Sequence, residues 1–276
     1  MNPALRKKIM DILLSVLLIY ACLMLLIYVN QRNLIYVPEK VSPAPSLYGV
    51  PEMNPMRVHT DDGLDLEGWY APPAAADKPV ILFFQGNAGN KGIRAFKAKF
   101  FMQRDYGFLL ASYRGYDGDP GEPSEQGLYK DARAYIAWLK AQGVPLSRIV
   151  LYGESLGTGV VVQMATEFPD IRGIILECPY TSMAAVTQKH MPLVPIYFIV
   201  RDRFSSIRKI GSVRAPVLIL HGKLDMIVPF SMGKRLFEAA PNPKTMEVFP
   251  LGGHNDLYSY GAGEKILLFL EKFPEK

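Results

Sequence analysis

The stretch from Ile149 to Gly159 constrains the fold of this chain more than any other. An apolar run ends at Gly153, Ser155 lies two residues later between glycines, and residues 160–168 are compatible with a helix. This is a G-x-S-x-G pattern in which a sharp strand-to-helix turn lifts the serine hydroxyl above a sheet edge. Such a turn strains the serine backbone, and strain of this kind is common at functional sites. Because the bare pattern arises by chance in about one sequence in ten of this length, its context must support it.

Segments that resemble strands and helices alternate on both sides of this turn. The predicted strands cover 80–84, 108–113, 149–152, 173–177, 217–221 and 245–249. The predicted helices cover 91–104, 124–142, 231–240 and 264–273. An antiparallel pair, 56–60 and 64–70, precedes them around an Asp-Gly turn. This order predicts an α/β fold with a mostly parallel, doubly wound sheet and an antiparallel edge.

The segment Ile12–Val29 contains 18 residues and no charged side chain. As a helix it is about 27 Å long, close to the thickness of the hydrocarbon layer of a bilayer. A buried core helix would have a polar face, and a cleaved signal peptide has a shorter apolar region. We therefore expect an uncleaved transmembrane anchor. Cationic side chains at positions 6–8 outnumber Arg32 after the span, which predicts a cytoplasmic N-terminus and an extracytoplasmic domain, periplasmic in a bacterium.

Three regions follow from this pattern. Residues 1–32 form the cytoplasmic stub and anchor, and 33–56, rich in proline, form an extended strap. Residues 57–276 form the catalytic domain, with a short lid segment near 181–210. The apolar part of that lid, 191–200, suits an acyl pocket, contact with the bilayer, or ordinary packing of a short helix.

Composition excludes some classes of function. The net charge is +5, but lysines and arginines are spread along the chain, so we expect no nucleic-acid partner. The two cysteines, Cys22 and Cys178, lie in separate apolar segments and are expected to be buried free thiols. Nothing in the sequence indicates an oligomeric state.

A serine hydroxyl needs an imidazole as base, and the imidazole needs an acid to orient it. His254 follows the last predicted strand in a glycine-containing loop, and Asp225 follows the strand before it. The order Ser155, Asp225, His254 is the order of an α/β-hydrolase triad. Turn formation is the alternative role for Asp225. His221 has no acid strand between it and the serine, so it is expected to be a core or edge residue.

An oxyanion hole needs backbone N–H groups near the developing charge. One is expected from Leu156, directly after the serine, and the other from Asn87, with Ala88 as second choice. The loop 85–90 is glycine-rich, but it matches neither phosphate-binding pattern. The predicted chemistry needs neither a metal nor a cofactor.

Several further motifs carry a resemblance over nearly the whole chain from Asn33. They are NLIYVP at 33–38, DGLDLEGWY at 62–70, GNAGN at 86–90, YRGY at 113–116, PSEQGL at 123–128 and DMIVP at 225–229. With the serine turn, they resemble the Bem46-like branch of the α/β-hydrolase superfamily. The resemblance implies a membrane-anchored serine hydrolase with the triad named above. Gln85 departs from the histidine usual in that family, which puts the rigidity of the oxyanion loop in doubt.

The predicted function is hydrolysis of a carboxylic ester or thioester through an acyl-enzyme on Ser155. The expected substrate is a small or lipid-like acyl compound, and the expected contact through the anchor is the membrane. A serine peptidase of related fold shares the triad but usually carries an additional gating domain. A non-catalytic membrane scaffold is the alternative from another class, and it would be expected to have lost a triad residue.

Overall fold

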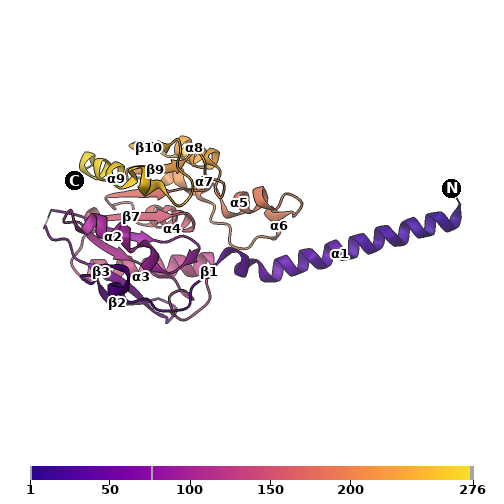
Figure 1. The fold of residues 1–276 in the computed structure, drawn as a ribbon, viewed down its shortest axis with the longest axis horizontal. Coiled ribbons are helices and arrows are strands. Elements are labelled where there is room, and N and C mark those ends of the chain that lie inside the picture. Colours follow the sequence, from indigo (N-terminus) through magenta and orange to yellow (C-terminus); the bar gives the residue numbers. More distant parts are fainter. Residues whose placement is uncertain (1, 76, 274–276) are drawn as a thin grey trace.

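The computed structural model describes residues 2–75 and 77–273 as an α/β domain with a long helix projecting from it (Figure 1). The domain is built on an eight-stranded sheet with the order β10-β9-β8-β7-β4-β6-β3-β2. The strands are β2 Asn54–His59, β3 Asp65–Ala71, β4 Val80–Phe84, β6 Gly107–Leu110, β7 Ile149–Glu154, β8 Gly173–Glu177, β9 Val217–Gly222 and β10 Lys244–Phe249. A separate two-stranded sheet pairs β1 Val37–Pro38 with β5 Ala88–Gly89.

The expected sheet is confirmed. Neighbouring strands from β10 to β6 run parallel. The hairpin β2–β3 lies at the edge, antiparallel to β6. Strand β4 is buried along its whole length, as its uninterrupted apolar sequence requires for a strand covered on both faces. The strand predicted over 108–113 ends earlier, at Leu110.

Helices cover both faces of the sheet. Helices α2 Ala95–Met102 and α9 Ala262–Lys272 pack on one face, and α3 Glu125–Ala141, α4 Leu156–Glu167 and α8 Phe230–Ala239 pack on the other. Ser124 caps α3 as expected, because its side chain accepts a hydrogen bond from Gly127 N. The helix predicted over 91–104 begins as a 3-10 turn, Lys91–Arg94, and its α-helical part ends at Met102.

Shorter helices connect these elements. They are the 3-10 turns η1 Pro45–Tyr48, η3 Leu146–Arg148, η4 Ile210–Ser212 and η5 Leu257–Tyr260, and the helices α5 Met183–His190, α6 Ile196–Ile199 and α7 Ser206–Lys209. Helices α5, α6 and α7 occupy the predicted lid segment. In Figure 1, α5 and α6 extend from the domain toward the side on which the N-terminal helix lies.

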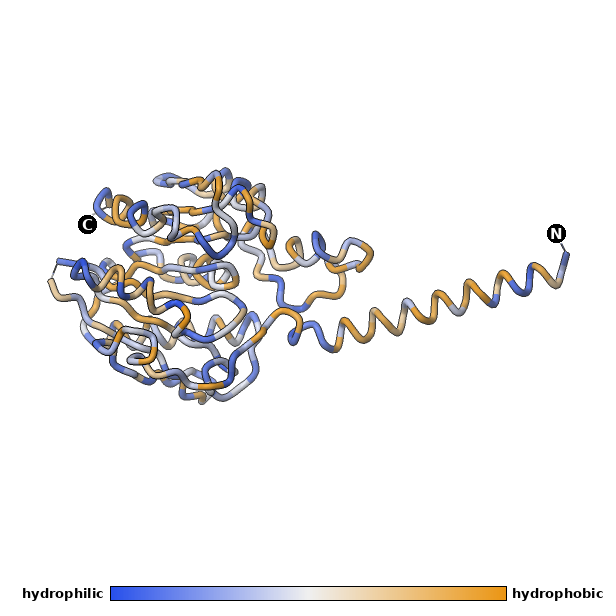
Figure 2. Tube along the Cα trace, viewed as in Figure 1, coloured by the Kyte–Doolittle hydropathy of each residue, from blue (hydrophilic) through white to orange (hydrophobic). Residues whose placement is uncertain are grey.

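The N-terminal helix α1, Pro3–Ile35, is the one described helix that is long and apolar enough to cross a membrane. Hydrophobic residues cover most of its length in Figure 2. It continues to Ile35, so residues 33–35, expected in the extended strap, are helical. The physical reason is packing, because Gln31 and Ile35 are buried against the domain. Cys22 is exposed on this helix, contrary to the expectation of a buried thiol, whereas Cys178 is buried.

Candidate active site

Ser155 lies in the turn between β7 and α4 with φ 48°, a left-handed conformation that is strained for a residue with a Cβ. The two flanking positions must be glycine because neither has room for a side chain. A Cβ on Gly157 would lie 2.1 Å from Phe84 O, and a Cβ on Gly153 would lie 2.5 Å from the carbonyl of Gly157. The strain expected from the sequence pattern is therefore present, and the close approach of strand and helix explains both glycines.

The structure brings together the three residues predicted to form the triad. The Ser155 Oγ lies 3.0 Å from His254 Nε2, and His254 Nδ1 lies 2.7 Å from Asp225 Oδ2. Asp225 follows β9 and His254 follows β10, which pair in parallel, so both side chains reach the same sheet edge as the serine turn. This arrangement can transfer a proton from the hydroxyl to the imidazole while the carboxylate fixes the ring.

Asp225 is held as a carboxylate by its neighbours. Its Oδ1 accepts hydrogen bonds from Ile227 N at 2.9 Å and Val228 N at 2.7 Å. Burial raises the pKa of Asp225, but the hydrogen bonds from His221 and His254 outweigh it, and the pKa lies well below its usual value. An ionised Asp225 favours the tautomer with a proton on His254 Nδ1, which leaves Nε2 free to accept the serine proton.

His221 is fully buried, as expected for a core histidine, but it also contacts the acid. Its Nε2 lies 2.9 Å from Val228 O and 3.4 Å from Asp225 Oδ2. The sequence predicted a core or edge histidine and not this contact with the acid. The available signal was that His221 ends the strand that leads into the Asp225 loop.

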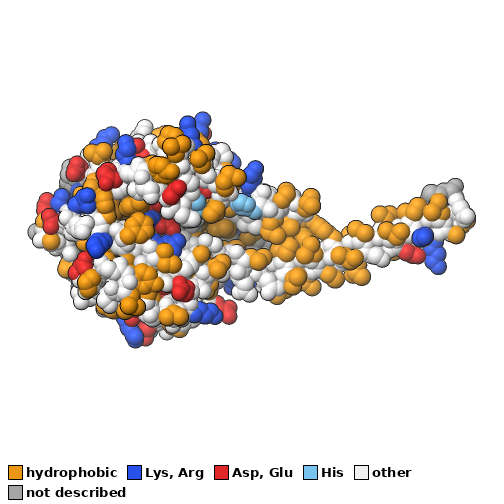
Figure 3. Space-filling model, viewed as in Figure 1, with side chains coloured by type: hydrophobic (Ala, Val, Ile, Leu, Met, Phe, Trp, Pro, Cys, Tyr) orange, Lys and Arg blue, Asp and Glu red, His pale blue; other side chains and the backbone are white. Residues whose placement is uncertain are grey.

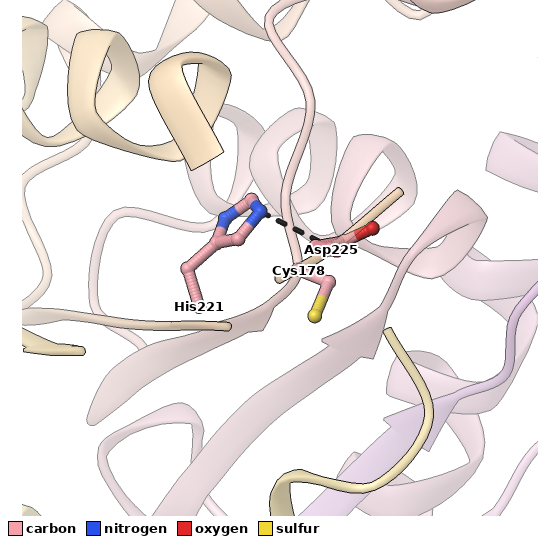
Figure 4. Close-up of side chains that lie close together, drawn as sticks. All are labelled: Cys178, His221 and Asp225. Atoms are coloured by element: carbon pink, nitrogen blue, oxygen red, sulfur yellow. Dashed lines mark ion pairs between the residues drawn. The ribbon is translucent and has the colours of Figure 1, made fainter. Parts of the chain in front are cut away.

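Cys178, His221 and Asp225 form a group with the donor atoms of a metal site (Figure 4). The chemistry of these atoms does not fit a metal ion. His221 Nε2 is at hydrogen-bond distance from a carbonyl, which requires a proton on that nitrogen. Burial and then the charges of Glu177 and Asp225 raise the pKa of Cys178, which disfavours the thiolate that a metal would bind. Cys178 and His221 instead pack around the side chain of Asp225.

The loop that contains Asn87 lies beside the serine, because a Cβ on Gly86 would lie 3.7 Å from Ser155 Cβ. Tyr116 Oη and Val37 N both donate to Asn87 O, at 2.8 Å and 2.9 Å, which fixes this peptide. Within the described residues, the N–H groups of Asn87 and Leu156 have no hydrogen-bond partner. They are therefore available to a substrate oxygen.

Gln85 is fully buried at the end of β4. Its backbone carbonyl accepts a hydrogen bond from Tyr113 Oη at 3.0 Å. Among the described residues, neither its side-chain oxygen nor its side-chain nitrogen has a partner. The loop is thus held through backbone atoms and through Tyr113 and Tyr116, and not through the side chain of Gln85.

A hollow of about 410 Å³ opens over the serine. Its lining includes Gly86, Asn87, Ser155, Ile227 and His254. A larger hollow of about 510 Å³ lies at the other end of the sheet, before the starts of β8, β9 and β10. Ligands in open parallel sheets bind at the carboxyl ends of the strands, so the smaller hollow is the candidate site.

A buried ion cluster lies beside the serine turn, at the hollow over Ser155, and the sequence did not reveal it. Lys97 Nζ lies 2.6 Å from both Glu154 Oε2 and Glu177 Oε2, and Arg94 Nη2 lies 2.9 Å from Glu154 Oε1. Burial lowers the pKa of Lys97, but the two carboxylates outweigh it and raise that pKa. Arg94 Nη1 also donates to Ala88 O at 3.0 Å. The cluster therefore links the loop 85–90 to the strand that precedes Ser155.

Replacing Lys97 by methionine is expected to destabilise the fold by about 3–5 kcal/mol, because it leaves the buried carboxylate of Glu177 without a cation and leaves Glu154 with Arg94 alone. Urea unfolding of the full chain in mild detergent, followed by tryptophan fluorescence, measures this effect. The matched control is Lys234→Met, which removes an exposed pair with Glu238 at 3.9 Å and is expected to change nothing measurable. Equal unfolding midpoints for the two variants would contradict a structural role of the cluster.

Comparison with known proteins agrees with the architecture. A family model described as alpha/beta hydrolase fold matches residues 79–198. The alpha/beta hydrolase domain-containing protein WAV2 of Arabidopsis thaliana is 34% identical over 280 residues, covering 89% of this chain and 89% of that protein. Lysophosphatidylserine lipase ABHD12 of Danio rerio is 32% identical over 198 residues, covering 64% of this chain and 51% of that protein. The Pyrococcus furiosus esterase Pf2001 has a TM-score of 0.69 at 17% identity, covering 87% of this chain and 98% of that one, which is a likeness of fold.

Proposed function

Because this chain belongs to the α/β-hydrolase superfamily, we propose that it is a serine hydrolase that cleaves carboxylic ester or thioester bonds. The observation that carries the proposal is the continuous hydrogen-bonded series from Ser155 through His254 to Asp225. We assign the chain to the Bem46-like branch on the motifs from Asn33 onward. One relative, the lysophosphatidylserine lipase ABHD12 of Danio rerio, supports an ester bond in a lipid-like substrate.

The proposed reaction has two halves. The Ser155 Oγ attacks the acyl carbon while its proton moves to His254 Nε2, and the N–H groups of Asn87 and Leu156 stabilise the oxyanion. His254 then protonates the leaving alcohol or thiol, and an acyl-enzyme forms on Ser155. In the second half, His254 takes a proton from water, the hydroxide attacks the acyl carbon, and the proton returns to Ser155 as the acid departs.

Covalent labelling tests the proposed function. A fluorophosphonate probe is expected to label the full chain, and p-nitrophenyl esters are expected to be hydrolysed. A non-catalytic scaffold would show neither reaction. Absence of both in a folded preparation would contradict the proposed function.

We propose that α1 crosses the membrane with residues 6–8 on the cytoplasmic side. A reporter enzyme fused to the C-terminus is expected to be active only in the extracytoplasmic compartment, because three cationic residues precede the span and one follows it closely. A matched reporter that works only in the cytoplasm provides the control. Activity of that second reporter alone would contradict this orientation.

A further inference from the structure

A third hollow, of about 330 Å³, lies between the domain end of α1 and the lid helices. Ile27, Leu34 and Ile35 of α1 form one wall, and Val186 of α5 and Ile196 of α6 belong to the other. The lining is mainly apolar, and the volume of the hollow falls within the range of roughly 300–1,000 Å³ that is typical of small-molecule sites. A hollow of this composition suits a hydrocarbon chain.

This apolar hollow adjoins the hollow over the serine. Asn87 and Ile227 line both of them. Asn87 belongs to the proposed oxyanion loop, and its side-chain nitrogen donates to Ile35 O at 3.0 Å, so the last turn of α1 is attached to that loop. A chain that occupies the apolar hollow therefore ends beside the position where Ser155 attacks.

The contact between α1 and the lid is fixed by specific polar bonds. Gln31 takes part in two of them. Its Nε2 donates to Ile199 O at 3.2 Å, and its Oε1 accepts from Arg201 N at 2.7 Å. Arg32 Nε lies 2.9 Å from the carboxylate of Asp202, which is almost fully buried. These bonds hold the two walls at a set separation. The hollow is therefore a defined part of the fold, and its shape requires α1.

The lid also presents large apolar side chains to its surroundings. Leu193 is 85% exposed and Phe198 is 87% exposed. Tyr20 Oη in the apolar part of α1 donates to Leu193 O at 2.9 Å, so this end of the lid lies at the level of the proposed membrane span. Figure 3 shows hydrophobic side chains gathered where the lid and α1 lie together. A bilayer accounts for their exposure, because it takes up apolar surface that water would not.

We propose that α1 is a wall of the substrate site as well as a tether, and that the hollow binds the acyl chain of an amphiphile held in the membrane. This inference rests on the proposed function. The substrate class is a single acyl chain joined by an ester or thioester to a polar group. The chain enters from the bilayer between α1 and the lid, and the carbonyl reaches Ser155 while the polar group remains in the hollow over the serine.

Variants that fill the hollow from opposite walls test the proposal. The full chain in lipid nanodiscs is assayed with p-nitrophenyl octanoate and acetate, and the ratio of the two kcat/KM values is compared. Ile27→Trp and Val186→Phe are each expected to lower the octanoate-to-acetate ratio at least about tenfold, because even one methylene excluded from an apolar pocket has an effect of that size. Leu26→Trp is the matched control, since Leu26 is 61% exposed on the same helix and does not line the hollow.

Unchanged ratios in both filling variants would overturn the proposal, as would a wild-type preference for acetate over octanoate. Labelling by a small fluorophosphonate separates this failure from failure of the proposed function. If the wild type is labelled but the filling variants keep the wild-type ratio, only the acyl hollow is excluded. If the wild type is not labelled, the serine hydrolase function itself is excluded. A lysophospholipid and an S-palmitoylated peptide then distinguish the two carriers of such a chain, and turnover of neither would overturn the inference.

Discussion

Replacing Ser155 by alanine is expected to lower kcat for p-nitrophenyl esters by about 10⁴–10⁶-fold. The methyl group cannot attack the acyl carbon, so the acyl-enzyme route is lost and only the residual effect of binding and of the oxyanion loop remains. Fluorophosphonate labelling is expected to disappear completely. Steady-state kinetics of the purified full chain and gel fluorescence measure the two effects.

A serine elsewhere provides the control for this variant. Ser231→Ala changes an exposed hydroxyl on α8, outside the candidate site, and is expected to leave both turnover and labelling at wild-type levels. The midpoint temperature of thermal unfolding is expected to be no lower for Ser155→Ala than for the wild type, because alanine retains the Cβ and adds no atom to the tight turn. A purified Ser155→Ala variant with full turnover would refute Ser155 as the nucleophile.

Replacing Asp225 by asparagine is expected to lower kcat by about 10⁴-fold with little change in fold. The N–H groups of Ile227 and Val228 both donate to Oδ1, so the amide oxygen will occupy that position. The amide nitrogen then faces His254 Nδ1 in place of the carboxylate oxygen. It donates a hydrogen bond there, which places the imidazole proton on Nε2 and removes the acceptor for the serine proton.

The chain contains a matched aspartate–histidine pair for comparison. His59 Nδ1 lies 2.9 Å from Asp65 Oδ1, and both side chains are largely exposed. Asp65→Asn makes the same chemical change at the surface and is expected to leave kcat unchanged. If Asp225→Asn retained a kcat similar to that of Asp65→Asn, then Asp225 would not be the residue that orients His254.

Local patterns were sufficient for the serine turn and for most of the sheet. Gly153 and Gly157 mark a place where strand and helix backbones nearly touch, and no other residue type fits there. The apolar run of β4 and the turn before β3 likewise reflect requirements within a few residues. The strand expected over 108–113 was too long, because a periodic apolar pattern does not show where the ladder of hydrogen bonds to neighbouring strands ends.

Contacts between distant segments were beyond such reasoning. Lys97 is 57 residues from Glu154 and 80 residues from Glu177 in the chain, so no spacing in the sequence indicates their ion cluster. His221 offered only a weak signal, because its contact with Asp225 depends on the path of the loop after β9. The hydrogen bonds between Gln31 and residues 199 and 201 depend on how α1 meets the lid.

The sequence by itself determined the type of fold and the chain order of Ser155, Asp225 and His254. It did so because alternating apolar segments dictate parallel strands, and parallel strands deliver the residues that follow them to one edge. The tertiary structure alone decided that the last turns of α1 lie against the lid and enclose an apolar hollow beside that edge. The physical reason is that the hollow belongs to two surfaces about 170 residues apart in the chain, and its shape exists only once packing has brought them together.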